Sequence, residues 1–358
     1  MLKLLYIVRT FSPVGGMERY VFETAREMAA RGHQVTALCR TTDEDLAAAI
    51  GVEVIKLHPE PSQRGWHDRY VFRDVVSEFF AAPANRRFDI THSHDNTVEQ
   101  DVSTEHGPCT ARGLRLKPWK HLDYSARKNF AIETQKFHGP NLQALVSCAQ
   151  RVEDIALREY PHLAEKITRV ITPAYSYLPP VAKDPDRLPR VLGFMGRDWK
   201  RKGLPVALEI FRHLRRQDSA WTMLIAGCPA ETLTSKIRRS LPDGAHILGR
   251  TEAREFFGRI DVLVHPAKDE PFGMVMSEAL SCGVPVVFSD QCGAAAHLQS
   301  AGLRVLALED PIADWVRACH DLAGRPFPPL ITRTWSDVAV EHEALYEAVL
   351  RAKDDGGR

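Results

Sequence analysis

The chain has 358 residues, which is long for one domain and suits two domains of about 150–180 residues each. Its 44% apolar content, 26% charged content and net charge of +1 are ordinary for a soluble protein and argue against general nucleic-acid binding. No apolar run reaches the ~20 residues of a membrane helix. The seven scattered cysteines form no Cys-x-x-Cys pair, which favours a reduced cytoplasmic setting over disulfides or a zinc site.

Short apolar runs alternate with stretches of helical periodicity along most of the chain, which is typical of parallel α/β sheets. In the first half we expect strands at 4–8, 34–39, 52–57, 89–93, 101–104, 143–147 and 167–171, and helices at 17–31 and 150–160. In the second half we expect strands at 190–194, 222–226, 246–248, 262–265, 284–288 and 303–306, and helices at 204–216, 232–240 and 253–259. This alternation predicts two doubly wound, Rossmann-like domains that face each other across a cleft.

The two halves are separated by the segment 175–189, in which four prolines lie among charged residues. Such a composition is typical of an interdomain linker. We therefore predict an N-terminal domain at 1–174, a linker at 175–189 and a C-terminal domain at 190–333. A final helix at 334–352 either pads the second domain or crosses back to the first, and the sequence leaves both arrangements open.

The most informative motif contains Glu270 and Glu278, which stand eight residues apart around a Pro-Phe-Gly turn. The turn exposes the N–H groups that open the following helix, and such a helix end attracts phosphate. One carboxylate precedes the helix and the other lies about two turns into it, so both are expected to face a ligand docked there. Carboxylates accept from paired hydroxyls, so the motif suits a sugar nucleotide, which offers a diphosphate and many hydroxyls.

A glycine-containing loop follows the first strand of each predicted domain. Gly15 and Gly16 permit a close backbone approach before a helix, although a tight turn without a ligand is the simpler interpretation of them alone. They lack the Gly-x-Gly-x-x-Gly pattern of nicotinamide sites. The loop 196–203 carries four cations within six residues. At the carboxyl end of a parallel strand, this favours a diphosphate-binding loop over a solvated loop whose charges bind no ligand.

Two histidines, His94 and His106, each come just after a short predicted strand. A single histidine is more often structural, but two at neighbouring strand ends favour a shared site. No His/Glu spacing in the sequence resembles a metal site.

Residues 112–128 form a basic segment with interleaved apolar and aromatic side chains and a single acidic residue, Asp123. Such a segment suits an anionic membrane surface; the alternatives are an anionic acceptor molecule and a solvated helix face. The candidate residues for acceptor or membrane contact are His94, Arg112, Arg115, Lys117, Trp119, Lys120, Arg127 and Lys128.

Taken in order, these elements resemble the retaining glycosyltransferases of the two-Rossmann (GT-B) type in family 4, also called group 1. The resemblance spans nearly the whole chain, and its most specific part is Glu270-x7-Glu278 followed by Ala279, Gly283 and Pro285. The segment 290–297 and the basic insertion after His106 are similar to those of the lipopolysaccharide core α-glucosyltransferases. The loop 196–203 differs from the commoner family form, because Lys200 stands where a glutamate is usual.

The resemblance implies a role for each matching position. Arg197 and Lys202 would hold the diphosphate, Glu270 would lie beside the donor sugar, and His106 would contact that sugar near the reacting centre. Glu278 would accept from the nucleotide ribose. Further donor contacts would come from Gly15, Gly16, Arg250, Phe272, Gly273 and Met274.

The resemblance further implies a metal-independent hexosyltransferase that needs no cofactor and takes a nucleotide-diphosphate sugar, with a UDP-sugar favoured. The acceptor would be a glycan or glycolipid of the cell envelope, with lipopolysaccharide core favoured, and nucleic acid is not an expected partner. The enzyme would work in the cytoplasm, with a peripheral position on the inner face of the membrane as a further expectation. The alternatives are a nucleotide-sugar epimerase of the same fold and a non-catalytic sugar-nucleotide binding protein.

Overall fold

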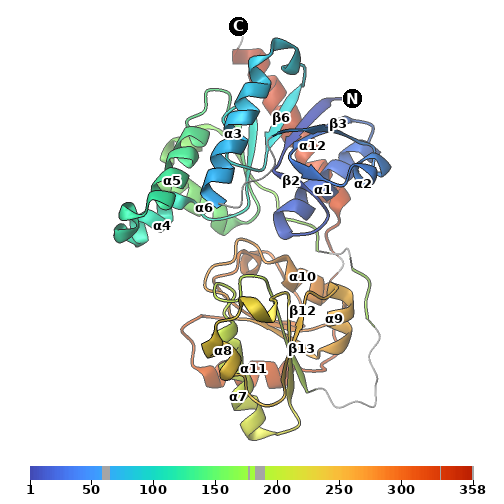
Figure 1. Ribbon diagram of the computed structural model, residues 1–358. Coiled ribbons are helices and arrows are strands. Elements are labelled where there is room, and N and C mark those ends of the chain that lie inside the picture. The colour runs from blue at the N-terminus through green and yellow to red at the C-terminus, as the bar shows by residue number, and fades with distance from the viewer. Residues whose placement is uncertain (59–64, 176–177, 182–189, 331, 357–358) are drawn as a thin grey trace. The chain divides into compact units, whose positions relative to one another are not determined.

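The computed structural model describes residues 1–358 except 59–64, 176–177, 182–189, 331 and 357–358, so most of the predicted linker lies outside the described residues. The described chain forms two compact units (Figure 1). Unit 1 comprises Met1–Pro173 and Trp335–Arg358, and unit 2 comprises Ala174–Thr334. Each unit is built on one main parallel sheet, as the alternation of strand and helix patterns predicts.

The main sheet of unit 1 has seven strands in the order β5-β3-β1-β6-β7-β8-β9. These strands are β1 (Lys3–Ile7), β3 (Gln34–Cys39), β5 (Val52–Lys56), β6 (Ile90–Ser93), β7 (Val102–Glu105), β8 (Ala144–Ser147) and β9 (Ile167–Val170). A small second sheet pairs β2 (Thr10–Phe11) with β4 (Thr41–Thr42). The strand order reverses direction between β1 and β6, which is where open α/β sheets usually bind ligands.

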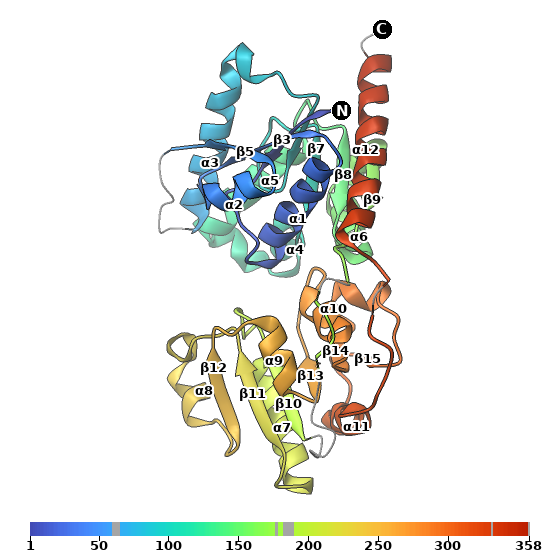
Figure 2. The same ribbon diagram turned by 90° about the vertical axis from the view of Figure 1, so that its right-hand side faces the viewer.

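The described residues of unit 1 form seven α-helices around this sheet. They are α1 (Gly16–Ala30), α2 (Glu44–Ala49), α3 (Gly65–Ala81), α4 (Thr110–Leu116), α5 (Tyr124–Phe137), α6 (Gln150–Glu159) and α12 (Trp335–Gly356). Short 3₁₀ turns lie at Pro83–Asn85 (η1), Pro118–Leu122 (η2) and Pro161–Glu165 (η3). The C-terminal helix α12 packs against α1 at the other end of the chain (Figure 2). The last helix is therefore part of unit 1, although unit 2 precedes it directly in sequence.

The sheet of unit 2 has six strands in the order β12-β11-β10-β13-β14-β15. They are β10 (Val191–Met195), β11 (Thr222–Ala226), β12 (Ala245–Gly249), β13 (Val262–His265), β14 (Val286–Ser289) and β15 (Leu303–Leu306). The helices are α7 (Leu204–Gln217), α8 (Ser235–Arg239), α9 (Ala253–Arg259), α10 (Met274–Ser281) and α11 (Ile312–Leu322), with 3₁₀ turns η4 (Ala230–Thr232) and η5 (Gly293–Ala296). Here the order reverses between β10 and β13.

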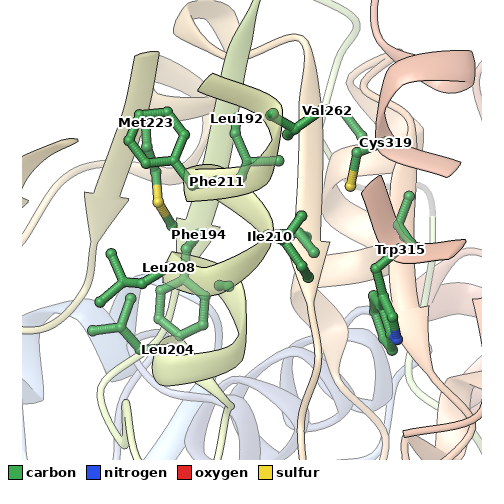
Figure 3. Close-up of a cluster of buried hydrophobic side chains, with 14 of the residues drawn as sticks. Leu192, Phe194, Leu204, Leu208, Ile210, Phe211, Met223, Val262, Trp315 and Cys319 are labelled. Carbon is green, nitrogen blue, oxygen red and sulfur yellow. The ribbon is translucent and has the colours of Figure 1, made fainter. Parts of the chain in front are cut away.

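The core of unit 2 explains why α7 and α11 lie on the sheet (Figure 3). Leu204, Leu208 and Phe211 recur at helical spacing along α7 and are fully or almost fully buried. Trp315 and Cys319 form a matching stripe on α11 and are fully buried. This packing holds the amino end of α7, and with it the loop 196–203, against the carboxyl end of β10.

The structure differs from the sequence prediction in several elements. Helices α2, α3, α4, α5 and α11 are present but were not predicted, although Phe72, Val76 and Phe80 on α3 show the four-residue spacing of a buried helix face. The helix predicted at 232–240 is only the short α8 preceded by η4. The strand predicted at 284–288 begins at Val286, because Pro285 has no N–H for the strand ladder and contributes only its carbonyl, which accepts from Leu263 N at 2.8 Å.

No helix among the described residues is long and apolar enough to span a bilayer.

Candidate active site

The centre of the candidate site in unit 2 is the buried carboxylate of Glu270, which follows β13. Two cations from the loop 196–203 approach the same oxygen: Lys202 Nζ lies 3.1 Å from Glu270 Oε2, and Arg201 Nη1 donates to Oε2 at 3.1 Å. The imidazole of His265, the last residue of β13, lies behind it with Nε2 3.7 Å from Oε2. The loops after β10 and β13 therefore meet at the point where the strand order of this sheet reverses.

The backbone of Glu270 is held as firmly as its side chain. Glu270 forms an isolated parallel bridge with Cys292, in which its N–H donates to Gln291 O at 3.1 Å and its carbonyl accepts from Gly293 N at 2.9 Å. Arg201 Nη1 also donates to the Asp269 carbonyl at 2.6 Å. The carboxylate consequently has a fixed position relative to the basic loop.

Glu270 stays ionised in this setting. Burial raises the pKa of Glu270, but contact with His265 and the charges of Lys202 and Arg201 lower it more strongly, so the pKa ends well below its usual range. His265 is itself fully buried, and this burial lowers its pKa. The neutralising positive charge therefore comes from Lys202 and Arg201.

Two glycines allow the basic loop to take this shape. Gly203 precedes α7 with a φ of 83°, and a side chain there would collide with the carbonyl of Pro266. Gly196 lies against the aliphatic stem of Lys202, so a Cβ at position 196 would displace that side chain. Arg197, in contrast, is exposed and makes no side-chain hydrogen bond or ion pair with the described part of the chain.

The turn between the two glutamates has the predicted form. Gly273 caps the amino end of α10 in the left-handed region with a φ of 96°, where a side chain would collide with Met276. Phe272 is buried and stacks on Tyr175 with 5.8 Å between ring centroids. Glu278 is buried on α10, but it lies four residues after the first helical residue, one turn into the helix and not two.

Arg201 was not predicted as a site residue, and it is the side chain that contacts both Glu270 and the Asp269 carbonyl. The signal available in the sequence was the unusual number of cations in the loop 196–203. Charge alone does not distinguish Arg201 from its neighbour Lys200, which is exposed and lies over the Trp199 ring at 5.2 Å.

In unit 1, the two predicted histidines are in direct contact. His94 follows β6 and His106 follows β7, and these strands pair in parallel, so their carboxyl ends are adjacent. His94 Nδ1 lies 2.9 Å from His106 Nε2, and the two rings stack with centroids 5.2 Å apart. His94 is buried, and its Nε2 has no hydrogen-bond partner among the described residues.

The histidine pair rests on a buried polar chain that reaches the C-terminal helix. The His92 ring stacks on His94 with centroids 4.3 Å apart, and its Nδ1 lies 2.7 Å from Tyr346 Oη on α12. Tyr346 Oη in turn lies 2.9 Å from Tyr6 Oη on β1, and His92 Nε2 lies 2.6 Å from Thr104 Oγ1 on β7. Neither His92 nor Tyr346 was predicted as a site residue, because a strand residue facing the sheet interior and an aromatic residue on an apolar helix face both look like ordinary core positions.

Burial keeps these histidines neutral. It lowers the pKa of His106 to about 3 and lowers those of His92 and His94 well below 6.5, and the neighbouring histidines add to the effect on the latter two. His106 keeps partial exposure to solvent, whereas His92 and His94 are buried. A neutral His106 can therefore donate or accept a hydrogen bond at the surface of this site without adding a charge.

The remaining predicted donor contacts are at the surface. Gly15 and Gly16 are exposed at the amino end of α1, where Gly15 has a φ of 114°. Glu18 lies in the first turn of the same helix, and a Cβ at position 15 would strike its carboxylate. This negative charge competes with any anion that approaches the helix end. Arg250 is exposed just after β12.

The basic segment 112–128 folds into α4, η2 and the start of α5. Arg115 is engaged in an ion pair with Glu159 at 2.7 Å, and Lys128 lies over the Tyr70 ring at 5.2 Å. Large apolar side chains are exposed in its middle, and the most exposed are Trp119 at 66% and Leu122 at 91%. Within the described ranges, no group of three or more His, Cys, Asp or Glu residues could hold a metal ion.

Comparisons with known proteins agree with this architecture in both units. The family model "Glycosyltransferase Family 4" matches residues 14–173, and the model "Glycosyl transferases group 1" matches residues 189–324. The chain is 23% identical over 326 residues to the lipopolysaccharide glucosyltransferase WaaG of Escherichia coli, covering 84% of this chain and 83% of that protein. It is 28% identical over 361 residues to a D-inositol 3-phosphate glycosyltransferase of Saccharomonospora viridis, covering 87% and 82%.

Solved structures share the fold. The crystal structure of WaaG, a glycosyltransferase involved in lipopolysaccharide biosynthesis, superposes with a TM-score of 0.72 at 18% identity and covers 98% of each chain. The structure of Anabaena Alr3699/HepE in complex with UDP-glucose superposes with a TM-score of 0.65 at 13% identity and covers 99% of each chain. The predicted GT-B fold class is therefore confirmed.

Proposed function

Because the chain belongs to the family 4 (group 1) glycosyltransferases, which transfer a sugar from a nucleotide sugar, we propose that it is a retaining hexosyltransferase acting on a cell-envelope glycan. The observation that carries the proposal is the pairing of the buried Glu270 with Lys202 and Arg201 in front of the amino end of α10. This arrangement combines a fixed carboxylate, a basic loop and the amino end of a helix. Each of these suits a different part of a nucleotide-diphosphate sugar.

In the proposed donor complex, the diphosphate lies between the basic loop and the start of α10. Lys202 and Arg197 neutralise the phosphates, and Arg197 is exposed and without a competing carboxylate among the described residues. The N–H groups of Gly273 and Met274 add the favourable end of the helix dipole. Glu278 accepts from the ribose hydroxyls, and Glu270 accepts from a hydroxyl of the sugar. The shortest cation contacts of Glu270 go to Oε2, so Oε1 is the oxygen assigned to this hydroxyl.

Transfer then follows a front-face route that needs no side-chain nucleophile. The acceptor oxygen bonds to the anomeric carbon on the side from which the diphosphate departs, and the departing phosphate oxygen takes the acceptor proton. Lys202 and Arg197 stabilise the charge that develops on the leaving group, which is where preorganised charges lower a barrier most. In unit 1, His106 is held by His94 and stays neutral, so it can donate a hydrogen bond to a sugar hydroxyl or accept one from it.

The acceptor proposed is lipopolysaccharide core, and the support is the similarity to WaaG together with the exposed apolar and basic segment 112–128. Trp119 and Leu122 would enter the interfacial layer of an anionic membrane, and the surrounding cations would approach lipid headgroups. With these contacts the enzyme would lie peripherally at the membrane in which a glycolipid acceptor resides. UDP is the proposed nucleotide, supported by the fold similarity to a structure that binds UDP-glucose.

A donor and acceptor panel tests the proposal. Purified protein is incubated with UDP-, GDP- and ADP-hexoses, with and without lipopolysaccharide core acceptor, and the products are analysed by mass spectrometry and NMR. We expect acceptor-dependent transfer from a UDP-hexose, with the new linkage keeping the α configuration of the donor. Conversion of the donor sugar without any acceptor would instead indicate an epimerase. Binding of UDP without transfer or donor hydrolysis across the panel would indicate a non-catalytic protein.

A further inference from the structure

The guanidinium of Arg69, on the second turn of α3, has few partners in unit 1. Its one hydrogen bond within the described part of the chain runs from Nη1 to Asn129 Oδ1 on α5, at 3.1 Å. The partner is an uncharged amide. A guanidinium carries five N–H donors, so the described residues use only a small part of the hydrogen-bonding capacity of Arg69.

Two of the carboxylates that act on Arg69, those of Asp95 and Asp68, are already occupied by other arginines. Both oxygens of Asp95 accept from Arg9, at 2.8 Å from its backbone N and 2.8 Å from Nε. Asp68 bridges two guanidiniums, with Oδ2 accepting from Arg9 Nη1 at 3.2 Å and Oδ1 accepting from Arg40 Nη1. Arg40 is almost completely buried in this cluster. In this cluster three arginines thus outnumber two carboxylates, and Arg69 has no carboxylate partner among the described residues.

A third nearby carboxylate, Glu133, does not fill this gap. Its oxygens accept from Thr110 N at 2.5 Å, Ala111 N at 3.0 Å and Tyr160 Oη at 2.9 Å. Burial and the charge of Arg9 lower the pKa of Arg69, and this effect outweighs the opposing effect of the surrounding carboxylates. Arg69 is therefore partly buried and has no dedicated counterion in the part of the chain that the structure describes.

The cluster lies at the carboxyl ends of two central strands of the sheet, which is where ligands are expected. Arg9 follows β1 and Asp95 follows β6, the two strands between which the strand order of unit 1 reverses. Asp95 is also the residue directly after His94, which contacts His106. The arginine cluster is therefore joined to the histidine pair through consecutive residues of the loop after β6.

We propose that Arg69 anchors a subsite for an anionic oxyacid group, a phosphate or a carboxylate, on the acceptor. The proposal rests on the proposed function in that the ligand is taken to be the sugar acceptor. A guanidinium presents two parallel N–H groups to the oxygens of either anion, and partial burial strengthens that contact. The fixed Arg9–Asp95 and Arg40–Asp68 pairs would hold the walls of the subsite and leave Arg69 to bind the anion.

The test compares anionic and neutral sugars on the full chain with UDP present in saturating amount, so that the diphosphate site is occupied. The probes are glucose 6-phosphate, glucuronate and glucose, with dissociation constants measured by NMR titration. We expect wild-type protein to bind at least one anionic sugar about tenfold more tightly than glucose, and Arg69→Gln to lose this preference. Preference for glucose 6-phosphate alone identifies phosphate as the ligand, and preference for glucuronate alone identifies carboxylate.

Arg87→Gln is the matched control, because it removes the same charge from an exposed arginine before β6 at the opposite end of that strand. It should keep the preference for anionic sugars. An unchanged circular dichroism spectrum and an unchanged thermal unfolding curve of Arg69→Gln show that the variant is folded. Equal preference in Arg69→Gln and wild type, or no preference in wild type, would overturn the subsite. A failure of wild type to bind UDP would count against the proposed function, while the sugar comparison would still decide the subsite.

Discussion

His94 Nδ1 and His106 Nε2 lie 2.9 Å apart at the ends of two neighbouring parallel strands. Only one of the two nitrogens can carry the proton of this hydrogen bond, so the tautomer of each ring depends on the other. The His94 ring is fixed by stacking on His92, and His92 is hydrogen bonded to Tyr346 of the C-terminal helix. The orientation of His106 is thus determined from the interior of unit 1.

The neutrality of these rings predicts that the protein loses stability in mild acid. In the unfolded chain a histidine gains a proton as the pH falls through about 6.5, whereas in the folded chain His106 stays neutral down to a pKa of about 3. The stabilising contribution is therefore complete above pH 6.5 and declines as the pH falls toward 3. The slope is at most about 1.4 kcal/mol per pH unit for each such histidine.

Urea unfolding measured between about pH 7 and pH 5 checks this prediction, with His106→Asn as the variant. We expect its free energy of unfolding to fall less steeply with pH than that of wild type. The exposed His320 of unit 2 provides the control, and His320→Asn should leave the slope unchanged. A His106→Asn slope identical to that of wild type would contradict the prediction.

Lys202→Ala should nearly abolish transfer while leaving the fold intact. The substitution removes a cation assigned to the leaving diphosphate, and losing such a charge lowers the rate by about 10²–10³. Glu270 would keep its contact with Arg201 at 3.1 Å, so the local structure should survive. Transfer rate and circular dichroism are the measurements. Lys200→Ala, which removes an exposed cation from the same loop, is the control, and wild-type turnover in Lys202→Ala would refute the diphosphate role.

Arg201→Ala should have a smaller effect, lowering the transfer rate by about tenfold. Arg201 is assigned to hold Glu270 in place, through Oε2 and the Asp269 carbonyl, and not to the phosphates. The loss of affinity should be greater for the intact donor than for UDP, because Glu270 is assigned to the sugar, which UDP lacks. Donor and UDP affinities measured by calorimetry distinguish this outcome from a general loss of the site, in which both would fall equally.

The double variant Trp119→Ser/Leu122→Ser should weaken binding to anionic vesicles about tenfold or more, because two large side chains would no longer enter the membrane interface. Co-sedimentation with phosphatidylserine-containing vesicles measures this, and neutral vesicles and added salt reveal the electrostatic part. Val340→Ser changes an exposed apolar residue on α12 and should bind as wild type does. Negligible binding of wild type to both vesicle types would exclude the membrane role.

Chelation by EDTA should leave transfer unchanged. The proposed mechanism assigns the leaving-group charge to Lys202, Arg197 and the start of α10, so it has no step that a divalent cation must perform. Initial rates with EDTA and with added Mg²⁺ or Mn²⁺ provide the comparison. Loss of activity that is restored by a divalent cation would overturn the metal-independent mechanism.

Sequence patterns predicted most strands of both sheets, because a buried strand between turns leaves a local signal in hydrophobicity. The same is true of the turn before α10, where Gly273 is needed for a left-handed φ of 96°. Helix α3 was missed in spite of its spacing. The contact between Arg201 and Glu270 was also missed, because it joins residues 69 positions apart in two different loops.

The sequence by itself determined the fold class, the family and the chemical types of residue available: two glutamates, a basic loop and paired histidines at strand ends. These features depend on the spacing of residues that are close together in the sequence, and this spacing is the same whatever tertiary structure the chain adopts. Tertiary structure alone decided which of them meet. His94 contacts His106 because β6 and β7 are neighbours, and Tyr346 reaches Tyr6 across 340 positions because α12 packs on unit 1. Such contacts arise from strand order and helix packing, to which residues far apart in the chain contribute together.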